Sequence, residues 1–84
     1  MRKIFESPIN STSECGEVGE IVRVFALESE AEFFNLDGMT YDEKLKFFNV
    51  RNHDNPMPGG LGREYSFDYT AQHCIVYEKL VYNV

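Results

Sequence analysis

The chain has 84 residues, and its 14 acidic side chains against eight basic ones give a formal net charge of −6. A chain of this length forms one domain, residues 1–84, with little volume for a deep pocket beside its hydrophobic core. The negative charge disfavours direct binding to nucleic acids and anionic membranes, and it favours a protein partner with a basic surface.

The chain shows no sequence feature of a membrane or secreted protein. No apolar run exceeds four residues, which is too short to cross a bilayer, and the first three residues are not followed by the apolar stretch of a signal peptide. We therefore expect a cytoplasmic protein, in which Cys15 and Cys74 stay reduced. Cys74 stands in an apolar stretch and is expected to pack as a small hydrophobic group.

The negative charge is concentrated in the first half of the chain. Ten carboxylates lie between Glu6 and Glu43 against one base, Arg23, which is a local balance of −9, whereas residues 44–84 hold five bases and four acids. Such a segment attracts a basic partner, although small proteins also carry negative charge for solubility alone. We expect the partner-binding surface to be formed by nine acids: Glu14, Glu17, Glu20, Glu28, Glu30, Glu32, Asp37, Asp42 and Glu43.

The first elements in chain order are a short strand and a loop. Residues 2–6 hold two apolar side chains between charged ones, and this pattern predicts an edge strand. Pro8 should end the strand, because proline cannot donate a hydrogen bond to a strand ladder. Residues 7–20 are rich in Ser, Glu and Gly, which is typical of a long surface loop.

A central strand is predicted near residues 20–28. Apolar side chains occupy both alternating faces between Ile21 and Leu27, and a strand of this composition is usually buried on both sides. Arg23 interrupts one face of this strand. We expect its guanidinium to reach a surface or to pair with a nearby acid.

Two reciprocal capping patterns predict a pair of helices within residues 30–50. Ser29 is followed three residues later by Glu32, and Thr40 is followed three residues later by Glu43. In this pattern the hydroxyl and the carboxylate each satisfy a backbone N–H that the first helical turn leaves unpaired. We therefore expect one helix to begin after each hydroxyl residue.

Gly38 lies between the two predicted helices and is expected to end the first one near Leu36, in a left-handed conformation that glycine tolerates. Each helix should carry an apolar stripe that faces the sheet. We expect the first stripe to contain Ala31, Phe34 and Leu36 and the second to contain Tyr41, Leu45 and Phe48, with Phe33 and Phe47 widening them.

Residues 51–62 form a second long surface loop, with two prolines and three glycines. Loops of this length often bind ligands. Its glycines could present backbone N–H groups to an anion, and the residues of this possible ligand site are Asn52, His53, Gly59, Gly60 and Arg63. The spacing of histidine, cysteine and acidic residues indicates no metal site, and no cofactor motif is present.

The last part of the chain predicts two strands. Residues 63–70 alternate, with Tyr65, Phe67 and Tyr69 on one face, and we expect these rings to pack against the helices. Residues 73–82 are rich in branched and aromatic side chains, which favours a strand. A terminal helix capped by Thr70 is the alternative.

Together these elements predict an α+β fold: a mostly antiparallel sheet of three to four strands, with a helical pair at about 30–50 packed on one face. No spacing of residues suggests a nucleophile, a general base or a catalytic pair of carboxylates, so we expect no enzymatic activity and no catalytic residues.

The function that we expect is that of a small inhibitor or adaptor, which docks its acidic surface on a basic groove of a nucleic-acid-handling protein. Inhibitors encoded by phages or mobile elements, such as anti-CRISPR and anti-restriction proteins, block their targets in this way. One alternative is a protein that sequesters an anionic nucleotide through the loop from Gly59 to Arg63. Another is a structural subunit, and the chain could also form a homodimer.

Overall fold

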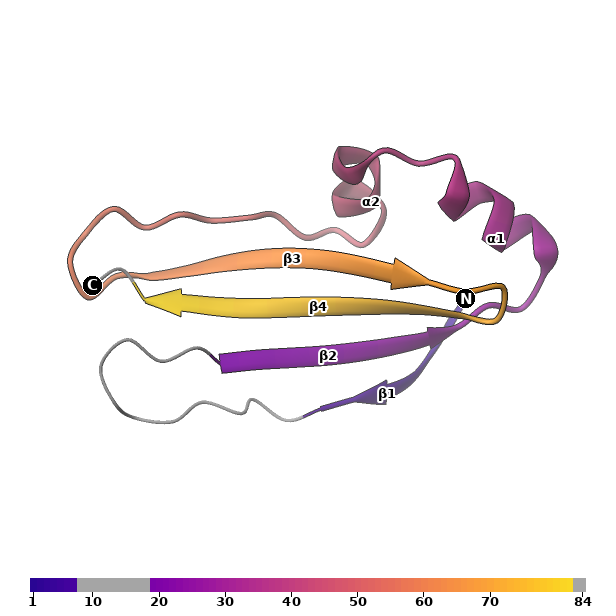
Figure 1. The fold of residues 1–84 in the computed structure, drawn as a ribbon, viewed down its shortest axis with the longest axis horizontal. Coiled ribbons are helices and arrows are strands. Elements are labelled where there is room, and N and C mark those ends of the chain that lie inside the picture. The colour runs from indigo at the N-terminus through magenta and orange to yellow at the C-terminus, as the bar shows by residue number, and fades with distance from the viewer. Residues whose placement is uncertain (8–18, 83–84) are drawn as a thin grey trace.

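The computed structural model describes residues 1–7 and 19–82. Within them the chain forms four strands and two helices that follow one another along a molecule with extents of 44 × 23 × 16 Å (Figure 1). The elements are β1 Arg2–Glu6, β2 Gly19–Ala26, α1 Glu30–Asp37, α2 Tyr41–Phe47, β3 Leu61–Tyr69 and β4 His73–Tyr82.

The strands form one antiparallel sheet in the order β1-β2-β4-β3. The predicted α+β class and both helices are therefore confirmed, as is the central position of β2, between β1 and β4. β2 already begins at Gly19 and β3 already begins at Leu61, so each strand includes the last residues of a segment that was predicted as a loop. Residues 8–18 of the first predicted loop, with Pro8, lie outside the described residues.

Residues 73–82 form a strand, so the alternative of a terminal helix is wrong. Thr70 does not cap a helix but closes the turn between β3 and β4. Its Oγ1 accepts hydrogen bonds from the backbone N–H groups of Gln72 and His73, at 3.2 and 3.1 Å. This threonine stabilises the hairpin whose two strands pair from Tyr69 and Cys74 onward.

The two helix starts differ in how completely they follow the capping prediction. At α2 both bonds form: Thr40 Oγ1 accepts from Glu43 N at 3.2 Å, and Glu43 Oε1 accepts from Thr40 N at 3.1 Å. At α1 the Ser29 hydroxyl accepts from Glu32 N at 3.4 Å, but the Glu32 carboxylate binds the amino group of Met1 at 2.8 Å. The second half of the predicted cap at α1 is therefore wrong, because the N-terminal amino group of Met1 binds that carboxylate.

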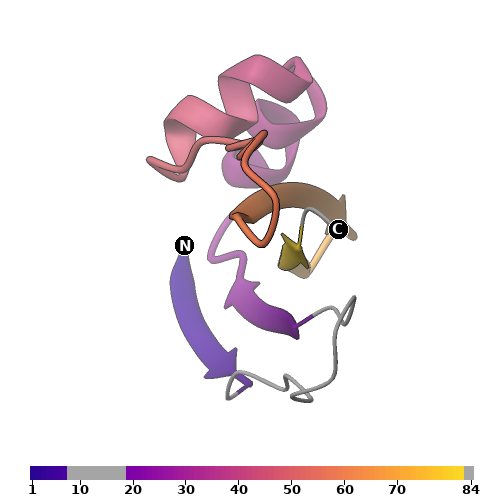
Figure 2. The ribbon, with the colours of Figure 1, turned by 90° about the vertical axis from the view of Figure 1, so that its left-hand side faces the viewer.

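The helices cover one face of the sheet through aromatic contacts (Figure 2). The ring of Phe48 lies 5.4 Å from that of Phe25 on β2 and 5.5 Å from that of Phe67 on β3. Phe33 of α1 lies 5.9 Å from Tyr69, the last residue of β3. The predicted meeting of the β3 rings with the helical rings is confirmed. Each such contact adds about 1 kcal/mol beyond the burial of apolar area.

The inward side of α1 differs from the prediction. Leu36 is 1% exposed and Phe33 packs on the sheet, whereas Phe34 is 66% exposed and Ala31 is also exposed. The predicted stripe of Ala31, Phe34 and Leu36 is thus wrong at its first two members, since α1 is rotated so that Phe33 and Leu36 face the sheet.

Gly38 also differs from the prediction, because its φ of −84° is right-handed and not left-handed. Its N–H donates to Phe34 O, as in a continuing helical turn. The left-handed residue of this region is Asn49, with a φ of +56°, which follows α2. Asparagine adopts this conformation more readily than most residues other than glycine.

Candidate functional site

The six carboxylates from Glu28 to Glu43 gather on the helical hairpin. The sequence has no basic residue in this interval, so the charge of the hairpin is not compensated locally along the chain. The hairpin covers one end of the elongated molecule (Figure 1). We call these residues the acidic hairpin: Glu28, Glu30, Glu32, Asp37, Asp42 and Glu43.

Three acids of the hairpin have partners inside the chain. Glu32 binds the N-terminal amino group, and Glu43 caps α2, where the hydrogen bonds to Thr40 hold the pKa of the Glu43 carboxyl below its usual value. Asp37 accepts a hydrogen bond from the Tyr69 hydroxyl at 2.7 Å, which raises the pKa of Tyr69. The Asp37 contact ties the hairpin to β3 and the Glu32 contact ties it to the N-terminus, whereas the Glu43 contact lies within the hairpin.

The other three acids, Glu28, Glu30 and Asp42, are exposed. They form no hydrogen bond and no ion pair with the residues that the structure describes. Glu30 and Asp42 stand in the first turns of α1 and α2, where a negative charge complements the positive end of the helix dipole. Three carboxylates are therefore free to meet a partner.

Two phenylalanine rings of the hairpin region point into solvent. Phe34 is 66% exposed and Phe47 is 48% exposed, while their chain neighbours Phe33 and Phe48 pack on the sheet. Each exposed ring contacts its half-buried neighbour, with ring centroids 5.5 and 5.0 Å apart. The sequence pattern had assigned both exposed rings to the core, so it missed them as surface residues.

Glu20, another acid of the predicted partner surface, does not join the hairpin. Glu20 lies near the start of β2, paired in register with Lys79 of β4, and eight residues before Glu28, the first acid of the hairpin. Glu14 and Glu17 lie outside the described residues. Of the seven acids of the predicted surface that the structure describes, six lie on the hairpin, and β2 carries Glu20 toward the other end of the sheet (Figure 1).

Three residues of the predicted ligand loop lie around one cavity. Asn52, His53 and Arg63 help to line a space of about 680 Å³ between the loop and β3. Asn52 is held in place by two bonds: its Oδ1 accepts from Tyr65 N at 2.8 Å, and its Nδ2 donates to the Tyr41 hydroxyl at 2.9 Å. The acidic residues Asp54 and Glu64 line the same cavity, which offsets the attraction of Arg63 for an anion.

Gly59 and Gly60 do not line this cavity. The N–H of Gly60 donates to Met57 O at 2.7 Å, and the N–H of Arg63 donates to His53 O at 2.7 Å. These two backbone donors are therefore already used within the loop and are not free to cradle a phosphate. Gly60 instead permits close packing, because a Cβ at this position would lie 2.4 Å from Asn55 Cγ.

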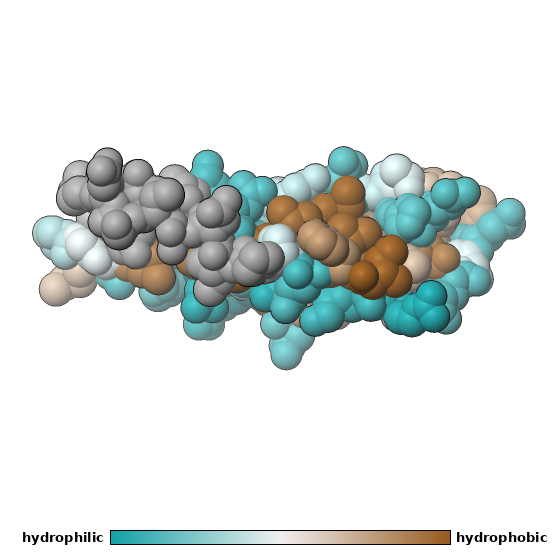
Figure 3. Space-filling view, turned by 90° about the horizontal axis from the view of Figure 1, so that it is seen from below, coloured by the Kyte–Doolittle hydropathy of each residue, from teal (hydrophilic) through white to brown (hydrophobic). Residues whose placement is uncertain are grey.

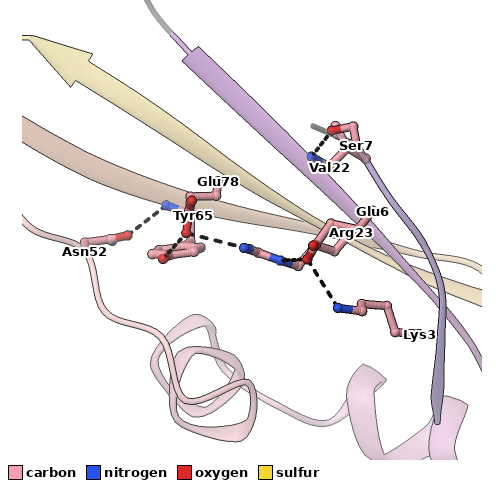
Figure 4. A network of polar contacts seen from close by, with 8 residues as sticks. All are labelled: Lys3, Glu6, Ser7, Val22, Arg23, Asn52, Tyr65 and Glu78. Atoms are coloured by element: carbon pink, nitrogen blue, oxygen red, sulfur yellow. Dashed lines mark hydrogen bonds and ion pairs between the residues drawn. The ribbon is translucent and has the colours of Figure 1, made fainter. Parts of the chain in front are cut away.

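A polar network crosses the helix-covered face of the sheet (Figure 4). Glu78 is 5% exposed and accepts a hydrogen bond from the Tyr65 hydroxyl, while Arg23 Nη1 lies 3.6 Å from Glu78 Oε1. Arg23 Nε donates to Glu6 Oε2 at 2.6 Å, so the expected pairing of this arginine with an acid is confirmed. Burial, reinforced by Glu78, raises the pKa of Tyr65. The network compensates the loss of hydration of the buried Glu78 carboxylate, which would destabilise the sheet if it were left unpaired.

The described residues contain no group of three or more histidine, cysteine or acidic side chains placed to hold a metal ion. None of the helices in the described part of the chain is long and apolar enough to span a membrane. Comparison of the chain with protein families, with curated proteins and with solved structures finds no match.

Proposed function

We propose that this protein is an inhibitor or adaptor that docks its acidic hairpin on a basic surface of another macromolecule. The observation that carries the proposal is the combination, on one hairpin, of three unpaired exposed carboxylates with two exposed phenylalanine rings. Charged groups of one sign steer a complementary partner, and a desolvated aromatic ring supplies much of the binding free energy in protein interfaces.

The partner class follows from the same chemistry. A surface that accepts Glu28, Glu30 and Asp42 must present lysine or arginine side chains, and one that accepts Phe34 must offer an apolar pocket among them. Grooves that bind nucleic acids are rich in basic side chains with apolar or aromatic platforms between them. We therefore propose a nucleic-acid-handling protein as the target, as for inhibitors that phages and mobile elements encode.

The nucleotide-sequestering alternative has weaker support. The cavity at Asn52, His53 and Arg63 offers two basic side chains, but two carboxylates line it as well and two backbone N–H groups of the loop are engaged. We place the alternative second for this reason. A shift of the thermal midpoint with a nucleotide, and with no protein partner present, would favour it, since a ligand that binds the folded state raises its apparent stability.

The experiment that tests the docking proposal compares two double charge reversals with the same change in net charge. Glu28→Lys with Glu30→Lys alters the hairpin, and Glu20→Lys with Asp54→Lys alters exposed acids elsewhere. Proteins captured from host extract by the native chain should be lost by the hairpin variant and kept by the control variant. Added salt and added DNA should both release them, because the contact is electrostatic and competes with nucleic acid.

If the same proteins are captured after the hairpin reversal, in added salt and with added DNA, this function is contradicted. Circular dichroism spectra of both variants serve as the folding control. The two changes remove favourable charge from the start of α1 and are expected to cost only about 1 kcal/mol together.

A further inference from the structure

The face of the sheet turned away from the helices is apolar at its centre. Side chains alternate between the two faces along each strand. Arg23 and Phe25 of β2 and Cys74 and Val76 of β4 face the helices, so the residues that flank them along these strands point to the opposite side. We call it the open face. Its apolar residues are Phe5 of β1, Val22, Val24 and Ala26 of β2, and Ile75 and Tyr77 of β4.

These residues are adjacent in the sheet. Phe5, Val24 and Ile75 form one row across three strands, and Val22 and Tyr77 form the next. Phe5 is 55% exposed and the others are half-buried. Figure 3 shows a hydrophobic patch between hydrophilic residues on the side of the molecule that faces away from the helices.

An antiparallel sheet with one covered face normally carries polar side chains on the other. β2 departs from this rule, since its alternating residues are apolar on both faces. The helix-to-sheet ring contacts of the described residues all lie on the face that holds Phe25 and Phe67. The composition of β2 therefore matches burial on two sides, while the helices of one chain cover one.

Charged residues at the two edges of the open face are complementary. Arg2, on the β1 edge, is in register with Ala26, and Asp68, on the β3 edge, is in register with Ile75. In the part of the chain that the structure describes, neither side chain takes part in an ion pair. The face thus runs from a basic edge at Arg2, across an apolar centre, to an acidic edge at Asp68. Farther along β3, Glu64 is in register with Lys79 on the same face.

We propose that two copies of this chain associate through their open faces, related by a two-fold axis parallel to the strands. This axis places the β1 edge of each copy over the β3 edge of the other, so that Arg2 of one copy meets Asp68 of the second copy. The apolar rows then pack together as in an aligned sandwich of two sheets.

The size of the face fits a reversible dimer. Four strands about 4.8 Å apart and about eight residues long make a face of roughly 15 by 25 Å, and two such faces bury on the order of 1,000 Å² together. That area is at the lower end of specific interfaces. The helices lie on the outer sides of the pair, so the dimer presents two acidic hairpins pointing in opposite directions. The association does not depend on the proposed function of the hairpin.

The first test is the mass of the protein in solution. Light scattering and sedimentation equilibrium over a wide concentration range should show a mass that rises from 9.7 kDa toward twice that value. Phe5→Glu, which places a charge in the apolar row of Phe5, Val24 and Ile75 at the β1 edge of the open face, should keep the chain monomeric. Phe34→Glu, at an even more exposed ring on α1, should leave the dimer unchanged. Melting curves show whether each variant folds.

The second test addresses the orientation and leaves the apolar residues untouched. Arg2→Glu alone and Asp68→Lys alone should each raise the dissociation constant of the dimer about threefold to tenfold. The double variant should restore it, since the two charges are exchanged and meet only between copies. A chain that stays monomeric at every concentration would overturn the proposal, as would a dimer that survives Phe5→Glu or one that the double variant fails to restore.

Discussion

Arg23 Nη1 lies 3.6 Å from Oε1 of Glu78, a carboxylate on the neighbouring strand that is almost fully buried. The Tyr65 hydroxyl donates to the same oxygen of Glu78. A buried charge is tolerated only where other charges and hydrogen bonds compensate the loss of hydration. This cluster therefore ties β2, β3 and β4 together at one point of the sheet.

Removing one member of this pair should destabilise the protein more than removing both. Arg23→Ala leaves Glu78 buried without its cation, and we expect it to lower the free energy of unfolding by about 2 kcal/mol, a value reduced because the arginine is partly exposed. The combination of Arg23→Met with Glu78→Leu replaces the ion pair with apolar groups and should cost less. Urea unfolding of the single and double variants measures both. If the double variant loses as much free energy of unfolding as the single variants lose in sum, the two side chains do not interact.

The sequence predicted the elements whose signals are local. Both helix starts follow from a hydroxyl and a carboxylate three residues apart, and β3 follows from strict alternation around Tyr65, Phe67 and Tyr69. These signals depend on neighbours within a few residues, which the sequence displays directly. The same is true of Cys74, whose apolar surroundings predicted the 1% exposure that the structure shows.

The sequence could not predict features that depend on contacts between distant residues. Glu32 binds the N-terminal amino group, 31 positions away, and therefore does not accept the predicted hydrogen bond from the backbone N–H of Ser29. Phe33 and Phe34 are adjacent and equally apolar, and only the packing of α1 on Tyr69 decides which ring turns inward. The Arg23–Glu78 contact requires β2 and β4 to be neighbours, and the strand order gives no local signal.

The sequence predicted only part of the candidate site, because the rest depends on contacts between distant residues. The acids of the hairpin all lie between Glu28 and Glu43, so their clustering could be expected, whereas Glu20 belongs to a strand that carries it away. The exposure of Phe34 and Phe47 could not be read from an apolar pattern, because that pattern marks apolar residues as buried wherever they fall.

Acid should destabilise the protein through the cap of α2. The folded-state pKa of Glu43 lies below its ordinary value of 4.5, because the carboxylate accepts the hydrogen bond of Thr40. The unfolded chain therefore binds the proton first as the pH falls, so the stabilisation present at neutral pH is lost below about pH 4.5. Glu6, whose pKa is lowered by its hydrogen bond to Arg23, acts in the same direction.

Glu43→Gln isolates this effect, because glutamine keeps the capping hydrogen bond but does not titrate. Urea midpoints measured from about pH 7 to about pH 3 should fall less steeply for this variant than for the native chain. Identical pH profiles for the two proteins would show that the Glu43 cap contributes nothing to acid unfolding.

The Cys74 thiol should react slowly while the protein is folded. Burial raises its pKa from 9.0 to about 11, which lowers the fraction of reactive thiolate near neutral pH about a hundredfold. Its side chain is also closed to solvent, at 1% exposure. In a Cys15→Ser background, labelling by a thiol reagent should be at least about a hundredfold slower in buffer than in denaturant. Equal rates would contradict the burial of this residue.

Two substitutions on α1 separate the role of its outer side from that of its inner side. Phe34→Ala removes a ring that is 66% exposed and should change the free energy of unfolding by less than about 0.5 kcal/mol. Leu36→Ala empties a fully buried position of the same helix and should cost about 3 kcal/mol, seen in urea unfolding.

For binding, the expected order is reversed. If Phe34 fills a pocket of the basic partner, Phe34→Ala should weaken capture at least about tenfold, since a desolvated aromatic anchor carries a large share of interface energy. Leu36→Ala, assayed well below its melting temperature, should bind normally, because this side chain faces the sheet. If the Phe34→Ala protein captures its partner with native affinity, the Phe34 ring is not part of the interface, and the hairpin binds through its carboxylates alone.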